Sequence, residues 1–364
     1  MKILHVESGK HLYGGALQVV FLMRGLKERG IESILACPTG SAIAEAGRPH
    51  ATIREIPMRG DADIGMLWKL RRLIRQERPA IVHLHSRRGS DIWGGFAASL
   101  EKIPVVLSRR VDNAESRWMV SLKYRLYDRV VAISEGIRNV LLSEGLSPEK
   151  VVCVRSAVDT IKYHPGRENI TWFRREFGLA EDEKTLAVVA QFIPRKGHST
   201  LIEALPAILE KQPRTRTLLF GKGPEEDHIK QLVQQKGLEG RVVFGGFRND
   251  LDKVIPCVDI LVHPASMEGL GVALLQAAAC EVPLIGGRAG GIPEIVRTGH
   301  TGELIEPGDV QALIKAALRL LESESLRKTY GQAGRKWIEE HFSITSMVSG
   351  NIAVYEQLLR KPSD

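Results

Sequence analysis

The sequence of 364 residues has little of what marks a secreted, zinc-binding or membrane-spanning protein. Its four cysteines are far apart and form no CxxC pair, which excludes a disulfide framework and a zinc knuckle of ordinary spacing. No run of 18 apolar residues occurs, and the apolar start MKILHV is too short for a signal peptide. We therefore expect free, buried thiols and a cytoplasmic protein that is soluble or attached to a membrane surface.

Motifs for nucleic-acid binding are also missing, although the sequence pI is about 9.3. No RNP, zinc or aromatic-platform motif accompanies the basic residues, so the sequence predicts no nucleic-acid partner. A nucleic-acid-binding protein stays open only as an alternative suggested by the net charge of +8.

That charge is unevenly distributed. Residues 1–165 hold 26 Lys and Arg against 17 Asp and Glu, a net of +9, whereas residues 166–364 hold 25 against 26, a net of −1. Part of the excess recurs along one predicted amphipathic helix and its end, at Arg71, Arg72, Arg75 and Arg78. A solvated basic face is one interpretation. The other is docking to anionic lipid or to a phosphorylated acceptor.

Short β-branched runs alternate with helical periodicities along the whole chain. This rhythm predicts an α/β protein whose parallel sheets are built from right-handed βαβ units. The expected strands of the first half are Ile3–Val6, Ile31–Ala36, Ile81–His85, Val105–Ser108, Arg129–Ile133 and Val151–Val154. Those of the second half begin at TLAVVAQF and continue near Arg216–Phe220, Arg241–Phe244, Ile260–His263, Pro283–Gly286 and Gly302–Ile305.

A change of composition separates the two halves. Pro165 and Gly166 precede a short charged helix, after which a strong buried-strand pattern begins again. We expect a doubly wound domain over residues 1–165, a second over 166–340, and a C-terminal helix over 341–364 that returns to the first domain. Open sheets of this type bind ligands at the carboxyl ends of their strands, so a crevice between the two domains is expected.

The stretch HPASMEGLGVALLQ, from His263 to Gln276, is the most informative for chemistry. An expected strand ends at His263, a polar loop carries Glu268, and glycines precede a helix that starts near Val272. The start of such a helix offers unpaired N–H groups and a positive dipole end to an anion such as a diphosphate. Glu268 can accept hydrogen bonds from sugar hydroxyls.

Eight segments in order make the chain resemble the retaining glycosyltransferase family 4, which has the GT-B architecture of two Rossmann-like domains facing a cleft. The resemblance covers essentially the whole chain, and bacterial lipopolysaccharide and cell-surface polysaccharide glycosyltransferases are its nearest type. The segments are Tyr13–Gly15, Val82–Ser86, Val130–Ile137, Glu149–Pro165, Pro194–Leu205, Phe220–Glu226, Val242–Phe247 and His263–Val296.

The resemblance implies roles for donor-binding residues. Lys196 corresponds to the lysine that neutralises the donor diphosphate, with Arg195 beside it, and Gly15 to a glycine that approaches the same phosphates. Glu268 corresponds to the carboxylate that holds the transferred sugar. Two further sets are implied, the sugar-pocket amides of Gly269, Leu270 and Gly271, and the nucleobase seat at Gly246, Phe247 and Arg248.

The chain also departs from the family pattern. The second glutamate of the family signature, which binds ribose, is Gln276 here; its side-chain carbonyl can still accept a hydroxyl proton. A Gly-Arg pair six residues before the lysine is Ala190 and Gln191, so one diphosphate cation is lost.

On the acceptor side, a histidine near the transferred sugar is replaced by Arg110. We therefore expect Arg109, Arg110 and Asp112 to face an anionic acceptor, and His85 to line the acceptor side of the cleft. His83 and His85 point to one face of a strand, so a metal pair is conceivable. No third ligand has recognisable spacing and the resemblance implies no metal, so no metal site is predicted.

These observations predict retaining, metal-independent transfer of a hexose-like unit from a nucleoside diphosphate sugar to a glycolipid or saccharide acceptor, in lipopolysaccharide or surface glycan biosynthesis. No cofactor is expected besides the nucleotide sugar. Two other readings stay open: a non-catalytic nucleotide-sugar-binding or regulatory homologue, suggested by Gln276 and Gln191, and a sugar-nucleotide epimerase of the same fold.

Overall fold

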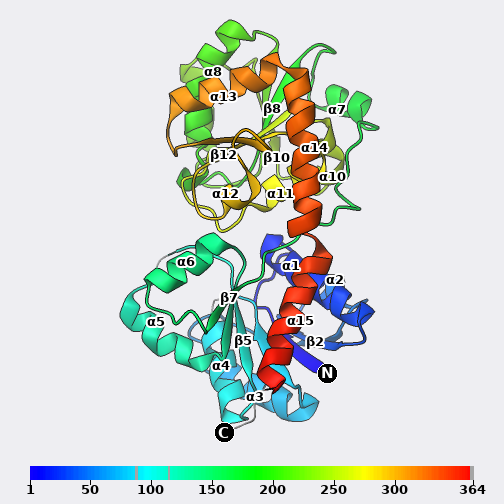
Figure 1. Ribbon diagram of the computed structural model, residues 1–364, viewed down its shortest axis with the longest axis vertical. Coiled ribbons are helices and arrows are strands. Elements are labelled where there is room, and N and C mark those ends of the chain that lie inside the picture. The colour runs from blue at the N-terminus through cyan, green and yellow to red at the C-terminus, as the bar shows by residue number, and fades with distance from the viewer. Residues whose placement is uncertain (87–88, 114, 361–364) are drawn as a thin grey trace. The chain divides into compact units, whose positions relative to one another are not determined.

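The chain folds into two compact units (Figure 1). The computed structural model describes residues 1–86, 89–113 and 115–360. Unit 1 comprises residues 1–157 together with the C-terminal segment from Ile344, and unit 2 comprises residues 158–343. The expected boundary after residue 165 therefore lies within unit 2, and the chain passes between the units twice.

Unit 1 is built on a seven-stranded sheet in which every strand pair is parallel, in the order β3-β2-β1-β4-β5-β6-β7. Its strands are β1 (Lys2–Val6), β2 (Glu32–Cys37), β3 (Thr52–Glu55), β4 (Ile81–Leu84), β5 (Val105–Arg109), β6 (Arg129–Ala132) and β7 (Val151–Cys153). All but β3 were expected. This edge strand, TIRE, is exposed or half-buried throughout, so its sequence lacks the apolar pattern of a central strand.

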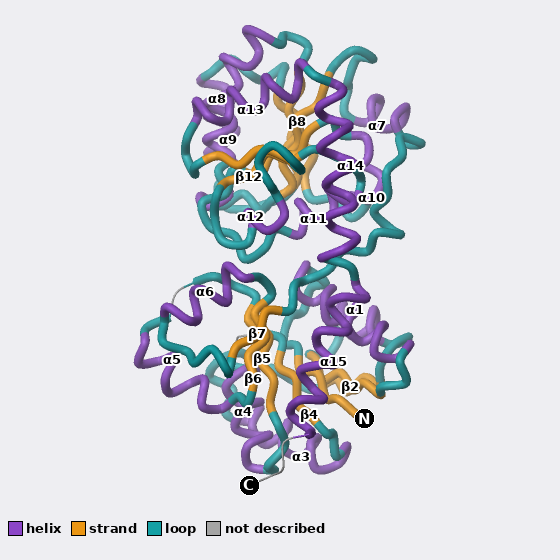
Figure 2. Tube along the Cα trace, in the orientation of Figure 1, coloured by secondary structure: helices purple, strands orange, loops and turns teal. Residues whose placement is uncertain are grey.

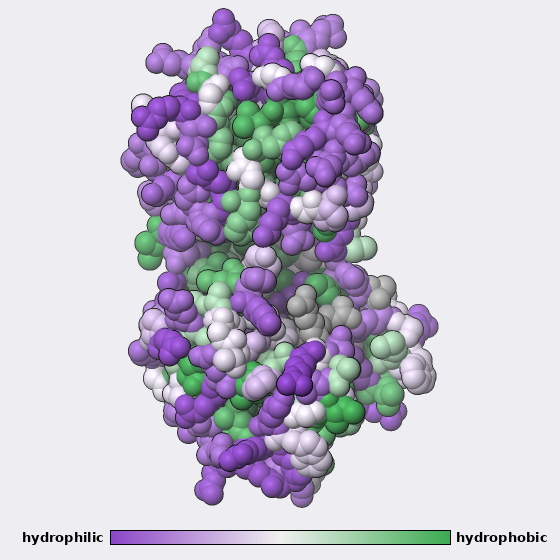
Figure 3. All heavy atoms as spheres, turned by 180° about the vertical axis from the view of Figure 1, so that it is seen from behind, coloured by the Kyte–Doolittle hydropathy of each residue, from purple (hydrophilic) through white to green (hydrophobic). Residues whose placement is uncertain are grey.

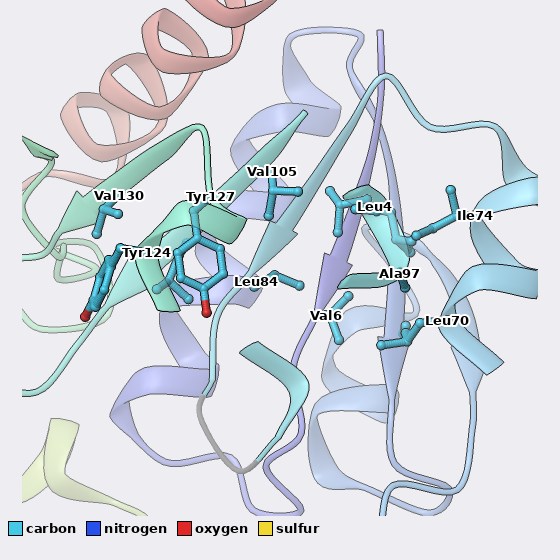
Figure 4. Close-up of a cluster of buried hydrophobic side chains, with 14 of the residues drawn as sticks. Leu4, Val6, Leu70, Ile74, Leu84, Ala97, Val105, Tyr124, Tyr127 and Val130 are labelled. Carbon is cyan, nitrogen blue, oxygen red and sulfur yellow. The ribbon is translucent and has the colours of Figure 1, made fainter. Parts of the chain in front are cut away.

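Helices cover both faces of this sheet because successive strand residues point to opposite sides. Ile3 of β1 packs with the cluster formed by α1 (Gly14–Glu28) and α15 (Ile344–Arg360), while Leu4 joins the opposite cluster. Figure 4 shows part of that second cluster around Leu4, Val6 and Leu84. The remaining helices are α2 (Ala42–Gly47), α3 (Gly65–Glu77), α4 (Ser90–Leu100), α5 (Arg117–Lys123), η1 (Tyr124–Leu126) and α6 (Glu135–Ser143).

Helix α15 is an integral part of unit 1. It packs against α1, where a side chain at Gly25 would collide with Val348. The hydroxyl of Tyr355 lies 2.6 Å from Nδ1 of His83 on β4, and both side chains are fully buried. The C-terminal helix thus completes both the apolar core and a polar contact beneath the sheet.

Unit 2 contains a six-stranded parallel sheet in the order β10-β9-β8-β11-β12-β13. Its strands are β8 (Lys184–Val189), β9 (Thr215–Phe220), β10 (Val242–Gly246), β11 (Ile260–His263), β12 (Leu284–Gly287) and β13 (Gly302–Ile305). Its helices are α7 (Ile170–Glu176), η2 (Pro194–Lys196), α8 (His198–Lys211), α9 (Glu226–Gln235), α10 (Leu251–Val254), η3 (Ile255–Cys257), α11 (Val272–Ala279), α12 (Ile292–Ile295), α13 (Val310–Glu322) and α14 (Glu324–His341).

The predicted fold class is confirmed: each unit is an α/β layer structure with a parallel sheet and helical crossovers (Figure 2). None of the four cysteines, all of which lie in the described part of the chain, forms a disulfide, and Cys37, Cys257 and Cys280 are buried. No helix among the described residues has the length and apolarity needed to span a membrane. On the face drawn in Figure 3, hydrophobic side chains are interspersed among a larger number of hydrophilic ones.

Two glycines on α14 provide a test of its packing in unit 2. Gly331 meets the backbone of Glu281, so a Cβ there would collide with the Glu281 carbonyl, whereas the nearest atom to a Cβ at Gly334 is 3.6 Å away. We expect Gly331→Ala to lower the free energy of unfolding by about 1–3 kcal/mol through overpacking. The control, Gly334→Ala, should be neutral or stabilise by about 0.5–1 kcal/mol, because alanine favours a helix interior. Urea unfolding followed by circular dichroism measures both, and equal effects would contradict this packing.

Candidate functional site

In unit 2, the loop after β8 holds Lys196 at the carboxyl edge of the sheet. Lys196 ends the short helix η2, and Gly197 then caps the start of α8 with a φ of 72°. A side chain at Gly197 would collide with the Pro264 carbonyl, so only glycine allows this approach of the two loops. The amide of Ser266 donates to the Arg195 carbonyl at 2.9 Å and joins the loops directly.

The second of these loops connects β11 to α11 and carries Glu268. His263 is the last residue of β11, and Gly271, with a φ of 99°, is the N-cap of α11. The side chain of Leu270 is buried and anchors the loop, while the Glu268 carbonyl accepts from the amide of Gly291 at 3.1 Å. The loop is therefore fixed on both sides of Glu268.

Lys196 and Glu268 meet, although 72 residues separate them. Lys196 Nζ lies 2.5 Å from Glu268 Oε2, and His263 Nε2 lies 2.7 Å from the same oxygen. The side chains are 12%, 17% and 3% exposed for Lys196, Glu268 and His263. Two donors thus converge on one carboxylate oxygen in a largely desolvated setting.

The electrostatics of Glu268 follow from these contacts. Burial by itself would raise the pKa of this carboxyl, but the hydrogen bond and charge of His263 and those of Lys196 outweigh it and lower the pKa to about 2. The carboxylate therefore stays ionised and remains a hydrogen-bond acceptor. Sequence reasoning gave His263 only a place at a strand end; its position five residues before the predicted acid was the available signal.

The other candidates of unit 2 lie at the same edge of the sheet or on α11. Gly269 and Gly271 flank Leu270 in the Glu268 loop, and Gln276 is buried on α11. Gly246 ends β10 with a φ of 66°. Phe247 follows it, about half exposed, with Lys222 Nζ 5.2 Å from its ring centroid.

Arg248 is less available to contact a nucleobase than its place in the sequence suggests. Its guanidinium makes a paired contact with Asp250, at 2.8 and 2.7 Å, and a further one with Glu176 at 2.8 Å. It also lies over the ring of Trp172. These partners raise the pKa of Arg248, and they hold its side chain against unit 2.

In unit 1, a pocket of about 280 Å³ lies at the carboxyl ends of the strands. His85 follows β4, Arg109 ends β5 and Arg110 comes next; all three line the pocket, as does Gly15 at the start of α1. Asp112 belongs to the same loop but does not line this pocket. The structure therefore brings together three of the four expected acceptor-side residues.

Three histidines of unit 1 form a buried cluster. His5 and His83 are register partners on β1 and β4, and one ring nitrogen from each of His5, His83 and His85 lies within 4.8 Å of the others. The sequence gave no sign of His5 because it lies on another strand. His83 contacts the hydroxyls of Tyr355 and Ser108 with its two ring nitrogens, so binding a metal would require breaking one of these hydrogen bonds.

The arginines expected on one basic helix lie on α3 and partly at its end. Arg71 and Arg75 both contact Glu101 Oε1, at 2.5 and 2.9 Å. Arg72 is exposed on the same helix, and Trp68 beside it is 59% exposed. The net positive charge of this surface is therefore smaller than the sequence pattern alone indicates.

The carboxylate of Glu268 gives a pH prediction. Its pKa is lower in the folded state than the ordinary 4.5, so its contribution to stability is present above about pH 4.5 and is lost as the pH falls toward 2. We expect Glu268→Gln to lower the unfolding free energy by up to about 3 kcal/mol at pH 7 relative to the wild type, and by progressively less below pH 4.5. Urea titrations at several pH values measure this, with the exposed Glu210→Gln as control. A difference independent of pH would contradict the predicted ionisation.

Comparison with known proteins gives two family matches that together span most of the chain. Residues 13–162 match Glycosyltransferase Family 4, and residues 169–337 match Glycosyl transferases group 1. The N-acetyl-alpha-D-glucosaminyl L-malate synthase of Bacillus anthracis is 28% identical over 308 residues, covering 82% of this chain and 80% of its own. A lipopolysaccharide core biosynthesis glycosyltransferase of Rhizobium meliloti is 26% identical, covering 94% and 95%.

Solved structures agree on the fold. The Anabaena HepE, crystallised with UDP and glucose, superimposes with a TM-score of 0.85 at 21% identity, covering 99% of this chain and all of its own. Sucrose-phosphate synthase of Thermosynechococcus elongatus superimposes with a TM-score of 0.81 at 19% identity, covering 99% of each chain. With both sheets, the loops that carry Lys196 and Glu268 and both family matches in agreement, the chain belongs to glycosyltransferase family 4 and has the GT-B fold.

Proposed function

We propose that this glycosyltransferase moves a hexose-like sugar from a nucleoside diphosphate sugar to a hydroxyl of a glycolipid or saccharide, with retention at the anomeric carbon. The observation that carries the proposal is the meeting of Lys196 and Glu268 beside the N-terminus of α11. A cation for a diphosphate, a carboxylate for sugar hydroxyls and unpaired helix amides are the groups that such a donor requires.

Donor binding exchanges one ion pair for another. Without donor, Lys196 is paired with Glu268. A diphosphate, which carries more charge than a carboxylate, attracts Lys196 and with it Arg195, and the negative charge that develops on the leaving phosphate strengthens this attraction. Glu268 then binds sugar hydroxyls while His263 continues to donate to Oε2 and keeps the carboxylate in place.

Retention follows if the acceptor hydroxyl attacks from the same side as the leaving phosphate. A phosphate oxygen of the leaving group then accepts the hydroxyl proton, so the enzyme supplies no nucleophile. Positive charge from Lys196, Arg195 and the start of α11 serves the role that a metal ion has in other transferases, and we propose that neither metal nor cofactor is needed. Gly15 at the start of α1 stays a predicted donor contact, through its backbone.

The remaining donor contacts carry the specificity. Gln276, buried in the middle of α11, accepts from a ribose hydroxyl, and the backbone of Gly246 and Phe247 lies at the nucleobase. Arg248 contributes by holding this segment through Asp250 and Glu176 rather than by contacting the base. UDP is the first nucleotide to test, because the HepE structures contain it.

We also propose that unit 1 attaches to anionic membranes, as suits an enzyme of lipopolysaccharide or surface glycan synthesis. Helix α5 exposes Trp118, Met119 and Leu122, of which Trp118 is 71% exposed, and Trp118 and Leu122 are one turn apart on the same face. Arg117 begins the same helix. Exposed aromatic and aliphatic side chains with neighbouring basic residues favour a lipid surface.

Activity of variants tests the transfer reaction. We expect Lys196→Ala and Glu268→Ala each to reduce kcat about 100-fold or more, because each removes a group that stabilises the transition state. Purified protein, UDP or GDP sugars and bacterial glycolipid are assayed for nucleoside diphosphate release, and circular dichroism checks that the fold is kept. Lys211→Ala, at an exposed position, is the control. Full activity in both variants would refute the proposal, and turnover without acceptor to an isomerised sugar would identify an epimerase.

Vesicle sedimentation tests the membrane surface. We expect the protein to sediment with anionic vesicles, but not with neutral ones, and to be released by high salt, because the attraction is largely electrostatic. The double variant Trp118→Ser/Leu122→Ser should bind anionic vesicles several-fold more weakly at equal net charge. Arg48→Gln, an exposed change on α2, is the control. Equal binding by the double variant and the wild type would show that α5 is not the contact.

A further inference from the structure

The cations that line the pocket of unit 1 differ in how well they are compensated. Arg109 is buried and its Nη1 lies 3.1 Å from Glu115 Oε1, and Lys123 Nζ lies 2.8 Å from Asp91 Oδ2. Both of these charges have a carboxylate partner within unit 1. They are structural ion pairs that close one wall of the pocket.

Arg110 lacks comparable compensation. Among the described residues no carboxylate forms an ion pair with it, and its Nη2 lies 3.5 Å from Nδ1 of His85. Its Nε, like that of Arg109, is buried and has no hydrogen-bond partner. Burial lowers the pKa of Arg110 to about 10, although the charge of Glu7 acts in the opposite direction. The guanidinium is therefore charged at neutral pH but incompletely solvated, a state that a bound anion improves.

The neighbour of Arg110 is a neutral histidine. Burial, followed by the charges of the surrounding histidines and Arg110, holds the pKa of His85 well below its ordinary value. Nε2 of His85 lies 2.9 Å from Nδ1 of His5, which fixes the ring. The other ring nitrogen, Nδ1, faces Arg110 Nη2 at the pocket, where it can accept a hydrogen bond from the guanidinium.

The volume and the lining of the pocket suit a small anionic group. Arg110, His85, Ser86 and Gly15 line a space of about 280 Å³. The buried carboxylate of Glu7 also lines it, and its Oε1 accepts from the amide of Gly9 at 2.8 Å. A Cβ at Gly15 would lie 3.4 Å from Cδ of Arg110, so the first turn of α1 is directly beside the arginine. Amides of that turn have no partner within the helix and add positive potential.

We propose that the acceptor carries a carboxylate or phosphate close to its reacting hydroxyl, and that Arg110, positioned by His85, binds this anion. The inference rests on the proposed function and defines the acceptor class for it. Planar oxyanions suit the fork of N–H groups of an arginine, whereas a neutral saccharide leaves Arg110 uncompensated. The anion has two possible sources, a small hydroxy acid and a phosphorylated lipid headgroup.

The test uses the full-length protein and its thermal unfolding. The probes are L-malate, its neutral diamide and myo-inositol 1-phosphate, added at equal ionic strength in the absence and in the presence of saturating UDP or GDP. We expect both anions, but not the diamide, to raise the unfolding temperature of the wild type by a few degrees, because a ligand that binds the folded state stabilises it. The anion that raises the unfolding temperature more identifies the source of the anionic group, a small hydroxy acid or a phosphorylated lipid headgroup.

Variants assign the effect to Arg110. Arg110→Gln should lose the response to both anions and keep the response to nucleotide, while Arg48→Gln, which removes an exposed arginine of unit 1, should keep both. No shift in the wild type, or a shift retained in Arg110→Gln, would overturn the inference. So would an anion response that disappears when nucleotide is added, because the anion would then occupy the position of the donor phosphate. Absence of any nucleotide response would instead count against the proposed function.

Discussion

Parallel pairing of every strand in both sheets is the constraint on which the rest of the structure depends. Parallel strands are covered by helices on both faces, so their middle positions accept mainly apolar side chains. Polar side chains with a chemical role therefore lie at the carboxyl ends of the strands. His263 ends β11 and Arg109 ends β5. The crossover connections then bring residues far apart in sequence to one edge, as the contact between Lys196 and Glu268 shows.

Much of the fold was readable from the sequence because buried parallel strands are short, apolar and bounded by turns. β11 and β13 have the predicted bounds, and most other strands differ from the prediction by one or two residues. The edge strand β3 escaped detection because neighbours bury little of it. The C-terminal helix expected over residues 341–364 begins at Ile344 as α15, after a short break at Phe342 and Ser343 that follows α14.

The candidate site was predictable only where family segments mark it. Lys196, Glu268 and His263 lie in such segments, but tertiary structure determines that His263 contacts Glu268 and that His5 contacts His85. The roles of charged side chains were the hardest to predict from the sequence, because ion-pair partners on other elements determine whether a charged side chain can still bind a ligand. Glu101 engages two arginines of α3, and Asp250 and Glu176 engage Arg248. Glu268 is paired with Lys196 and His263, whereas Arg110 forms no ion pair with a carboxylate among the described residues.

The position of α15 has a consequence for the order in which the chain acquires its structure. Unit 2 is complete in sequence once residue 343 has been made, whereas unit 1, although begun first, needs the last segment of the chain. Until Tyr355 and Val348 leave the ribosome, the face of the first sheet covered by α15 is open, and His83 lacks its hydroxyl partner. The domain made second can therefore finish folding before the domain that was begun first.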